Sequence, residues 1–120
     1  MKHEYHSSEY YAQAFRDFLH ESVGWKDSER RINQAFPADC SAGGVLLKCR
    51  SYCFSLTFQP RGEDSLEIVL EEGVDGDFKK GASRRGETKI NVHRTKKGKI
   101  SRSSLVSLFD WLYPHFQRRD

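Results

Sequence analysis

The spacing of the hydrophobic residues changes twice along this chain, and these changes limit the folds that it can adopt. Near the N-terminus the apolar side chains recur at helical spacing, at Tyr11, Phe15, Phe18 and Leu19. In the middle they recur at every second residue, at Tyr52, Phe54, Leu56 and Phe58. Near the C-terminus helical spacing returns, at Leu105, Leu108, Phe109, Leu112 and Phe116. The chain therefore combines helices and strands, because each spacing gives an apolar side to only one of these elements.

The helical spacing predicts one amphipathic helix at each end of the chain. The first runs over residues 8–23. A shorter helix is predicted over residues 28–36, where a proline follows and stops it. The last helix begins with Ser101 or Ser103 as its cap. Pro114 removes one backbone donor inside it, so we expect a kink or an early end there.

Alternation predicts strands over residues 52–58, 66–70 and 87–94. Residues 45–47 form either a separate strand or the start of one long strand that reaches residue 59. Residues 78–86 read FKKGASRRG, which predicts a flexible basic loop. We therefore expect one α+β domain over residues 1–120, an antiparallel meander of three or four strands flanked by N-terminal and C-terminal amphipathic helices.

No apolar run approaches the roughly 20 residues that span a bilayer. The N-terminus MKHEYHSSEYY has no apolar core of a signal peptide. These features predict a cytoplasmic protein, or a nuclear one in a eukaryote, that does not enter a membrane. No P-loop, dinucleotide fingerprint or nucleophile elbow is present, so no cofactor is expected. The sequence leaves the oligomeric state open.

Charge is distributed unevenly along the chain. Residues 61–77 carry seven acidic side chains and one basic one, whereas residues 78–120 carry 12 basic and three acidic ones. A basic segment of this kind is typical of proteins that bind polyanions. The predicted phosphate contacts fall in two clusters: Lys79, Lys80, Arg84 and Arg85, then Lys96, Lys97, Lys99 and Arg102. The second cluster leads into the N-terminus of the last helix, where free N–H groups attract anions.

The leading hypothesis is a small non-catalytic nucleic-acid-binding domain. Ser101, Ser103 and Ser104 are candidate donors to a phosphate beside the second cluster. The order helix, meander, helix is similar to that of double-stranded-RNA-binding domains and of the Alu-binding subunits of the signal recognition particle. The tight glycine, lysine and alanine spacing of the former is absent here, so no residue role carries over.

Two other hypotheses remain open. The charge asymmetry also suits a protein-interaction module, such as an inhibitor or adaptor, that is steered to a charged partner. Asp77, Glu87 and Lys89 resemble the metal-binding pattern of PD-(D/E)xK nucleases, in which two carboxylates hold Mg²⁺. Three interpretations are open for the acidic segment 63–77: a solvated strand face, a calcium-like oxygen cluster, or a partner that pairs with the basic strand. We expect the last, since opposite charges pair across strands.

The cysteines give a first testable prediction. The chain has three of them, Cys40, Cys49 and Cys53, and no second Cys-x3-Cys pair that would complete a zinc site. An odd count without a signal peptide predicts free thiols. We expect a thiol assay in denaturant, without prior reduction, to find three reactive groups per chain. Fewer than three in freshly prepared protein would contradict this prediction.

Overall fold

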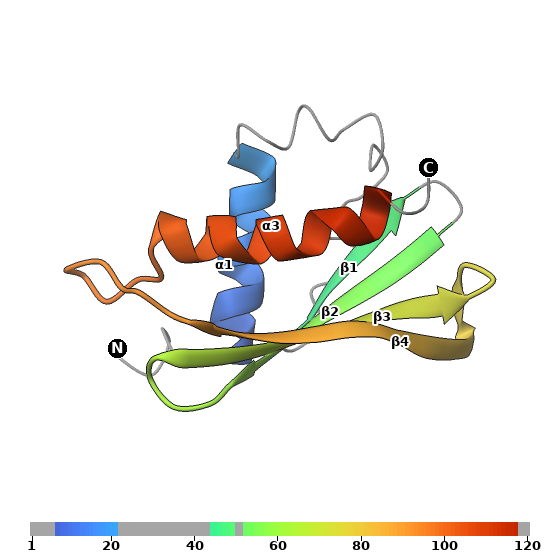
Figure 1. Cartoon of the computed structure of the whole chain (residues 1–120), viewed down its shortest axis with the longest axis horizontal. Helices are drawn as coiled ribbons and strands as arrows, with labels where there is room; N and C mark the ends of the chain where they lie inside the picture. Colours follow the sequence, from blue (N-terminus) through green and yellow to red (C-terminus); the bar gives the residue numbers. More distant parts are fainter. Residues whose placement is uncertain (1–6, 22–43, 50–51, 118–120) are drawn as a thin grey trace.

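A computed structural model of the protein describes residues 7–21, 44–49 and 52–117. Its elements are α1 (Ser8–Glu21), β1 (Gly44–Cys49), β2 (Tyr52–Pro60), β3 (Ser65–Val74), β4 (Asp77–Asn91) and α3 (Arg102–Gln117). The four strands form one antiparallel sheet, and the two helices flank it (Figure 1). The predicted α+β fold is confirmed. The helix predicted over residues 28–36, and residues 22 and 23 of the first predicted helix, lie outside the described residues.

The sheet is a simple meander in the order β1-β2-β3-β4. β1 pairs with β2, with Val45 opposite Leu56, so residues 45–59 form two strands. Directly opposed residues point to the same face, and every second residue shares that face. The register therefore gathers most of the buried strand side chains on one face: Val45, Leu47, Phe54, Leu56, Phe58, Leu66, Ile68 and Leu70.

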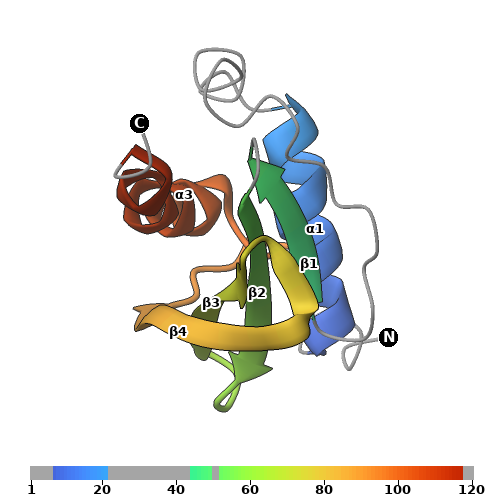
Figure 2. The same ribbon diagram turned by 90° about the vertical axis from the view of Figure 1, so that its right-hand side faces the viewer.

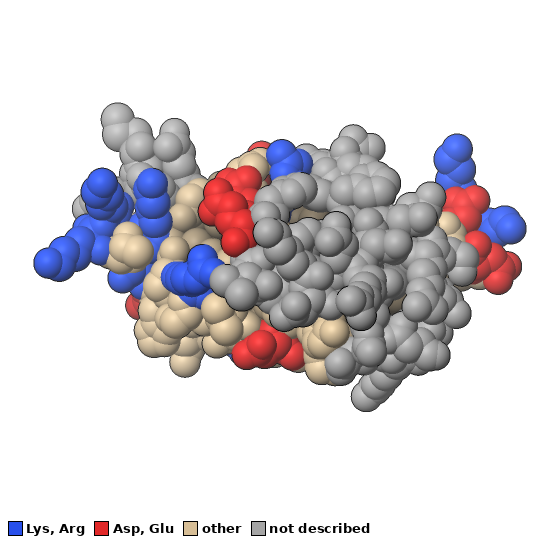
Figure 3. Space-filling view, turned by 90° about the horizontal axis from the view of Figure 1, so that it is seen from above, with Lys and Arg blue, Asp and Glu red and all other residues tan. Residues whose placement is uncertain are grey.

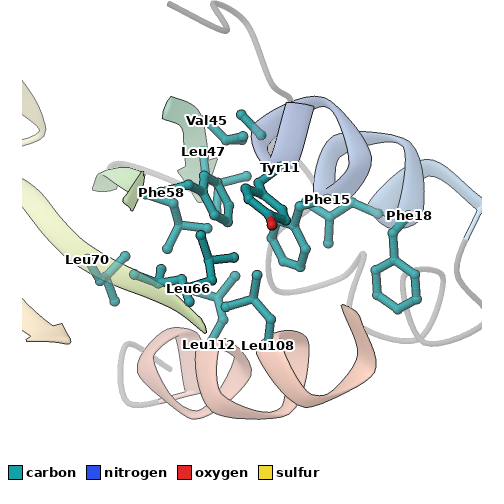
Figure 4. Packing of buried hydrophobic residues seen from close by; sticks show 14 of the residues in the cluster. Tyr11, Phe15, Phe18, Val45, Leu47, Phe58, Leu66, Leu70, Leu108 and Leu112 are labelled. Carbon is teal, nitrogen blue, oxygen red and sulfur yellow. The ribbon is translucent and has the colours of Figure 1, made fainter. Parts of the chain in front are cut away.

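Both helices pack on this apolar face. Phe15 of α1 lies with its ring centroid 6.0 Å from that of Phe58 in β2. Phe18 of α1 meets Phe109 of α3 edge to face at 6.3 Å, so the helices also contact each other. Figure 4 shows the core between α1, α3 and the strands, and Figure 2 shows the sheet curling beneath the helices.

Helical and alternating spacing predicts burial of Phe15, Phe18, Leu19, Phe54, Leu56, Ile68, Ile90, Leu105, Leu108, Phe109 and Leu112. All of these are buried except three at the margin of the core. Ile90, Leu105 and Phe109 are only partly buried, although they pack against the core. Ile90 belongs to the edge strand β4, which has a neighbour on one side only. Leu105 and Phe109 flank the fully buried Leu108 on α3, so each keeps one side outside the core.

The helix ends follow from their capping residues. The Ser7 hydroxyl accepts a hydrogen bond from the Tyr10 N–H at 3.0 Å, and Ser101 caps α3. The predicted early end near Pro114 is wrong, because α3 continues through Pro114 to Gln117. Pro114 is exposed and removes only one backbone hydrogen bond.

Within the described parts of the chain, neither helix is long and apolar enough to cross a membrane.

The basic loop predicted over residues 78–86 is also wrong, since these residues belong to β4. β4 follows β3 after a two-residue turn at Asp75 and Gly76, but its register against β3 shifts twice. Four residues, 78–81, have no opposite residue in β3, and neither has Arg85. Such bulges are common in edge strands, and they accommodate glycines and charged residues that a regular central strand disfavours.

Gly86 lets α3 lie close to β4. A methyl group at Gly86 would lie 3.1 Å from Cε1 of His115 and 3.5 Å from the Trp111 ring. The Trp111 and His115 rings contact each other edge to face, with centroids 5.2 Å apart. Trp111 is half-buried and packs against the core.

Two aliphatic residues of α3 give a matched test of this packing. Leu108 is 1% exposed and Val106 is 39% exposed. We expect Leu108→Ala to lower the free energy of unfolding by about 2–5 kcal/mol, because it leaves a cavity in the buried core. Val106→Ala should change it by less than about 0.5 kcal/mol. Urea unfolding followed by circular dichroism measures both, and equal losses would contradict the core described above.

Candidate functional site

The predicted basic residues lie in two separate places. Lys79, Lys80, Arg84 and Arg85, called here the strand cations, lie on β4. The hairpin cations are Lys96, Lys97, Lys99 and Arg102, which lie in the connection from β4 and at the start of α3. The molecule is 41 Å long, and the β3–β4 turn and the β4–α3 connection lie at opposite ends of its long axis (Figure 1). The structure therefore does not bring the two clusters together.

Acidic side chains compensate part of the charge of the strand cations. Arg85 Nε donates to Glu72 Oε1 at 2.5 Å, and Arg84 pairs with Glu87 at 3.1 Å. Lys79 and Lys80 are exposed in the bulge of residues 78–81, next to the turn that holds Asp75. Figure 3 shows Lys and Arg mixed with Asp and Glu at one end of the molecule, whereas Lys and Arg predominate at the other.

The Glu72–Arg85 pair depends on the bulge at Arg85. Glu72 lies opposite Phe54 on the core face of the sheet and is only 5% exposed. A buried carboxylate is costly without a partner. Arg85 is the extra residue of β4 at this point, and its guanidinium reaches Glu72 while its side chain stays 44% exposed. The predicted pairing of the acidic segment with the basic strand is thus confirmed for Glu72.

Glu67 and Asp77 of that segment have other partners. Glu67 accepts from Arg61 at 2.7 Å, although Lys89 is the residue opposite it in β4. The carboxylate of Asp77 accepts the N–H of Lys79 at 2.8 Å within the same strand. Within residues 7–21, 44–49 and 52–117, no three or more His, Cys, Asp or Glu residues are grouped to hold a metal ion.

The nuclease pattern is not assembled. Asp77 and Glu87 lie at different points of the single strand β4. Ten residues of extended chain span roughly 30 Å, whereas Mg²⁺ ligands lie ~2 Å from the ion. Glu87 also pairs with Arg84. The structure therefore does not bring Asp77, Glu87 and Lys89 together.

The hairpin cations stand on an ordered turn. Thr95 N–H donates to Lys99 O at 2.8 Å, and Gly98 N–H donates to Thr95 O at 2.9 Å. Arg94 and Ile100 form an antiparallel bridge, so residues 94–100 make a short hairpin. Gly98 has a φ of 88°, which is the left-handed conformation that glycine adopts at this position of a tight turn. The three lysines of the hairpin are therefore presented by a defined backbone.

Arg94 fastens this hairpin to the rest of the fold. Its Nη1 donates to Gly98 O at 3.0 Å, and its Nη2 donates to Glu63 O at 2.8 Å and to the Tyr11 hydroxyl. The guanidinium carbon also lies 5.7 Å from the centroid of the Tyr11 ring. In the sequence, Arg94 is only one of the 12 basic residues of segment 78–120. The alternation of the strand could have indicated its inward position. Every second residue there faces the core, and Arg94 follows Ile90 and Val92 in that series.

The start of α3 is organised by serines. Ser101 Oγ accepts the N–H of Ser104 at 3.3 Å, and Ser104 Oγ accepts the N–H of His93 at 2.9 Å. Ser104 is 2% exposed, so it is a structural residue and not a phosphate donor. Ser103 is exposed and shares a hydrogen bond with Ser101 Oγ at 3.0 Å. The N–H groups of Arg102 and Ser103 lie in the first turn, where helix geometry provides no intrahelical acceptor.

All four hairpin cations are exposed, and none forms an ion pair within the described part of the chain. The Arg102 guanidinium lies 5.4 Å from the centroid of the Phe18 ring, where it stacks on α1 and still faces solvent. This end of the molecule therefore combines four exposed positive charges, without an ion pair among the described residues, with the N-terminus of a helix.

No protein-family model, no curated protein and no solved structure matches this chain. Its function is therefore inferred from its own side chains.

The contacts of Arg94 give a test of the hairpin. We expect Arg94→Ala to lower the free energy of unfolding by about 1–3 kcal/mol, because it leaves hydrogen-bonding groups without their partner. Amide exchange of Thr95 and Gly98 should accelerate more than that of β2. Lys97→Ala is the matched control, since it removes a charge from the same hairpin and no contact described above. Unchanged exchange at Gly98 in Arg94→Ala would contradict the fastening role.

Proposed function

We propose that this domain binds nucleic acid through its phosphates, and that the hairpin cations with the N-terminus of α3 form the contact surface. The observation that carries the proposal is the difference between the two clusters. Arg84 and Arg85 are paired with carboxylates, whereas the hairpin cations are exposed and form no ion pair in the residues described. A polyanion binds most readily to exposed cations that have no carboxylate partner and that an ordered backbone holds in place.

The geometry favours contacts to phosphates over contacts to base edges. Lysine is a compact point charge without the planar fork that reads a base edge in two hydrogen bonds. Three of the four hairpin cations are lysines. The first-turn N–H groups beside Arg102 add donors that suit a phosphate oxygen. Binding of this kind is largely independent of nucleotide sequence and strongly dependent on salt.

The proposal is tested by removing the hairpin cations. We expect the combined change of Lys96, Lys97, Lys99 and Arg102 to Ala to weaken nucleic-acid binding at least about ten-fold at low salt. The slope of log affinity against log salt should fall by about 3, since each lost phosphate contact removes about 0.7–0.9. Fluorescence anisotropy with labelled oligonucleotides at several salt concentrations measures both quantities.

The opposite end of the molecule provides the matched control. Arg85 is kept in the control, since its loss would leave the buried Glu72 without this partner. Changing Lys79, Lys80 and Arg84 to Ala removes three positive charges, as many as the change of Lys96, Lys97 and Lys99 to Ala. We expect a smaller loss of affinity and a nearly unchanged salt slope. Equal effects of the two changes would show that only net charge matters. If the wild-type protein binds no nucleic acid at low salt, the proposal is rejected. Binding to a charged protein partner is then the remaining hypothesis.

A further inference from the structure

A stripe of side chains on α3 begins at the hairpin cations and stays partly exposed at the margin of the core. Arg102, Val106, Phe109 and Tyr113 follow one another at steps of four, three and four residues, so they lie on one side of the helix. Val106 is 39% exposed and is one of two exposed large hydrophobic residues in the described part of the chain. Phe109 and Tyr113 are half-buried, so each keeps part of its ring accessible.

Aromatic rings connect this stripe to the basic end. The Arg102 guanidinium lies 5.4 Å from the Phe18 ring centroid, and Phe18 lies 6.3 Å from Phe109. Phe109 and Tyr113 then stack with centroids 5.6 Å apart and planes 23° apart. Phe18 is 5% exposed and anchors the row to the core. The accessible part of the row is therefore the Phe109–Tyr113 pair with Val106 beside it.

We propose that this stripe is a base-stacking surface and that the ligand of the domain is single-stranded nucleic acid. This inference rests on the proposed function, because the hairpin cations supply the phosphate contacts at the start of the stripe. α3 runs from the hairpin end along the molecule (Figure 1), so a strand bound at the hairpin continues over Val106 and Tyr113.

The chemistry distinguishes a single strand from a duplex. Unpaired bases present their flat faces to aromatic side chains, and such stacking accepts every base. A duplex hides these faces between neighbouring base pairs and offers only phosphates and groove edges. A surface that combines accessible aromatic rings with adjacent cations is therefore complementary to a single strand.

The test compares three probes of about a dozen nucleotides, a length within the site sizes of single-strand binders. One is a single DNA strand, the second is the same backbone without bases, and the third is the duplex. The wild-type protein should bind the single strand roughly ten-fold more tightly than the strand without bases. Equal affinity for these two probes would overturn the inference and leave phosphate binding intact.

Tyr113 and Val106 are the positions to change, because Phe109 also packs against the core. Tyr113→Ala should weaken single-strand binding roughly ten-fold and leave binding of the strand without bases unchanged. Tyr113→Phe should restore binding, since it keeps the ring. Thermal unfolding of both variants shows whether the fold survives.

Val106→Glu gives a second test that does not depend on packing at the helix end. Ser107→Glu is its matched control, since it adds the same charge one residue further along and off the stripe. We expect the change at Val106 to weaken single-strand binding more strongly. Equal losses in the two variants, or a loss in Tyr113→Ala that is the same for all three probes, would overturn the stacking surface. If the wild type binds none of the probes, the proposed function itself fails.

Discussion

Two helices, one near each end of the chain, cover one face of the sheet. The other features of the structure depend on this packing. Phe18 of α1 meets Phe109 of α3 at the margin of the core, so the two helices contact each other above the sheet. Because α3 must lie on that face, the chain has to turn back directly after β4. The turn is made by the hairpin of residues 94–100, which Arg94 ties to Tyr11 of α1. The positions of the hairpin cations are thus a consequence of core packing.

The basic segment that looks continuous in the sequence has two different roles in the fold. Its first half is incorporated into β4, where a bulge brings Arg85 to the buried Glu72. Its second half projects from the opposite end, where no carboxylate among the described residues pairs with it. A count of charges cannot separate these halves, because both contain the same residue types. The strand register and the burial of each residue distinguish the two halves. Neither is defined until β3 and β4 have paired.

Hydrophobic spacing was sufficient to predict α1, α3, the meander and most of the core, since burial of Phe15, Leu56 or Leu108 depends mainly on period. It failed at residues 78–86, where glycines and charges resemble a loop by composition and a strand forms only through pairing with β3. For the candidate site, the exposed lysines were predicted from composition alone. The structural roles of Arg94 and Ser104 were not, because they depend on contacts with residues far away in the sequence, such as Tyr11.

The irregular register of β4 has a consequence for the behaviour of the protein in concentrated solution. β4 is an edge strand of the described sheet, and a long regular edge invites a strand from a neighbouring molecule. Here residues 78–81 and Arg85 interrupt the row of backbone donors and acceptors, and lysines and arginines stand along it. Another copy of the chain would meet a broken hydrogen-bonding pattern and like charge at the same edge. The bulges that place Arg85 beside Glu72 thereby also protect the fold against aggregation through its open edge.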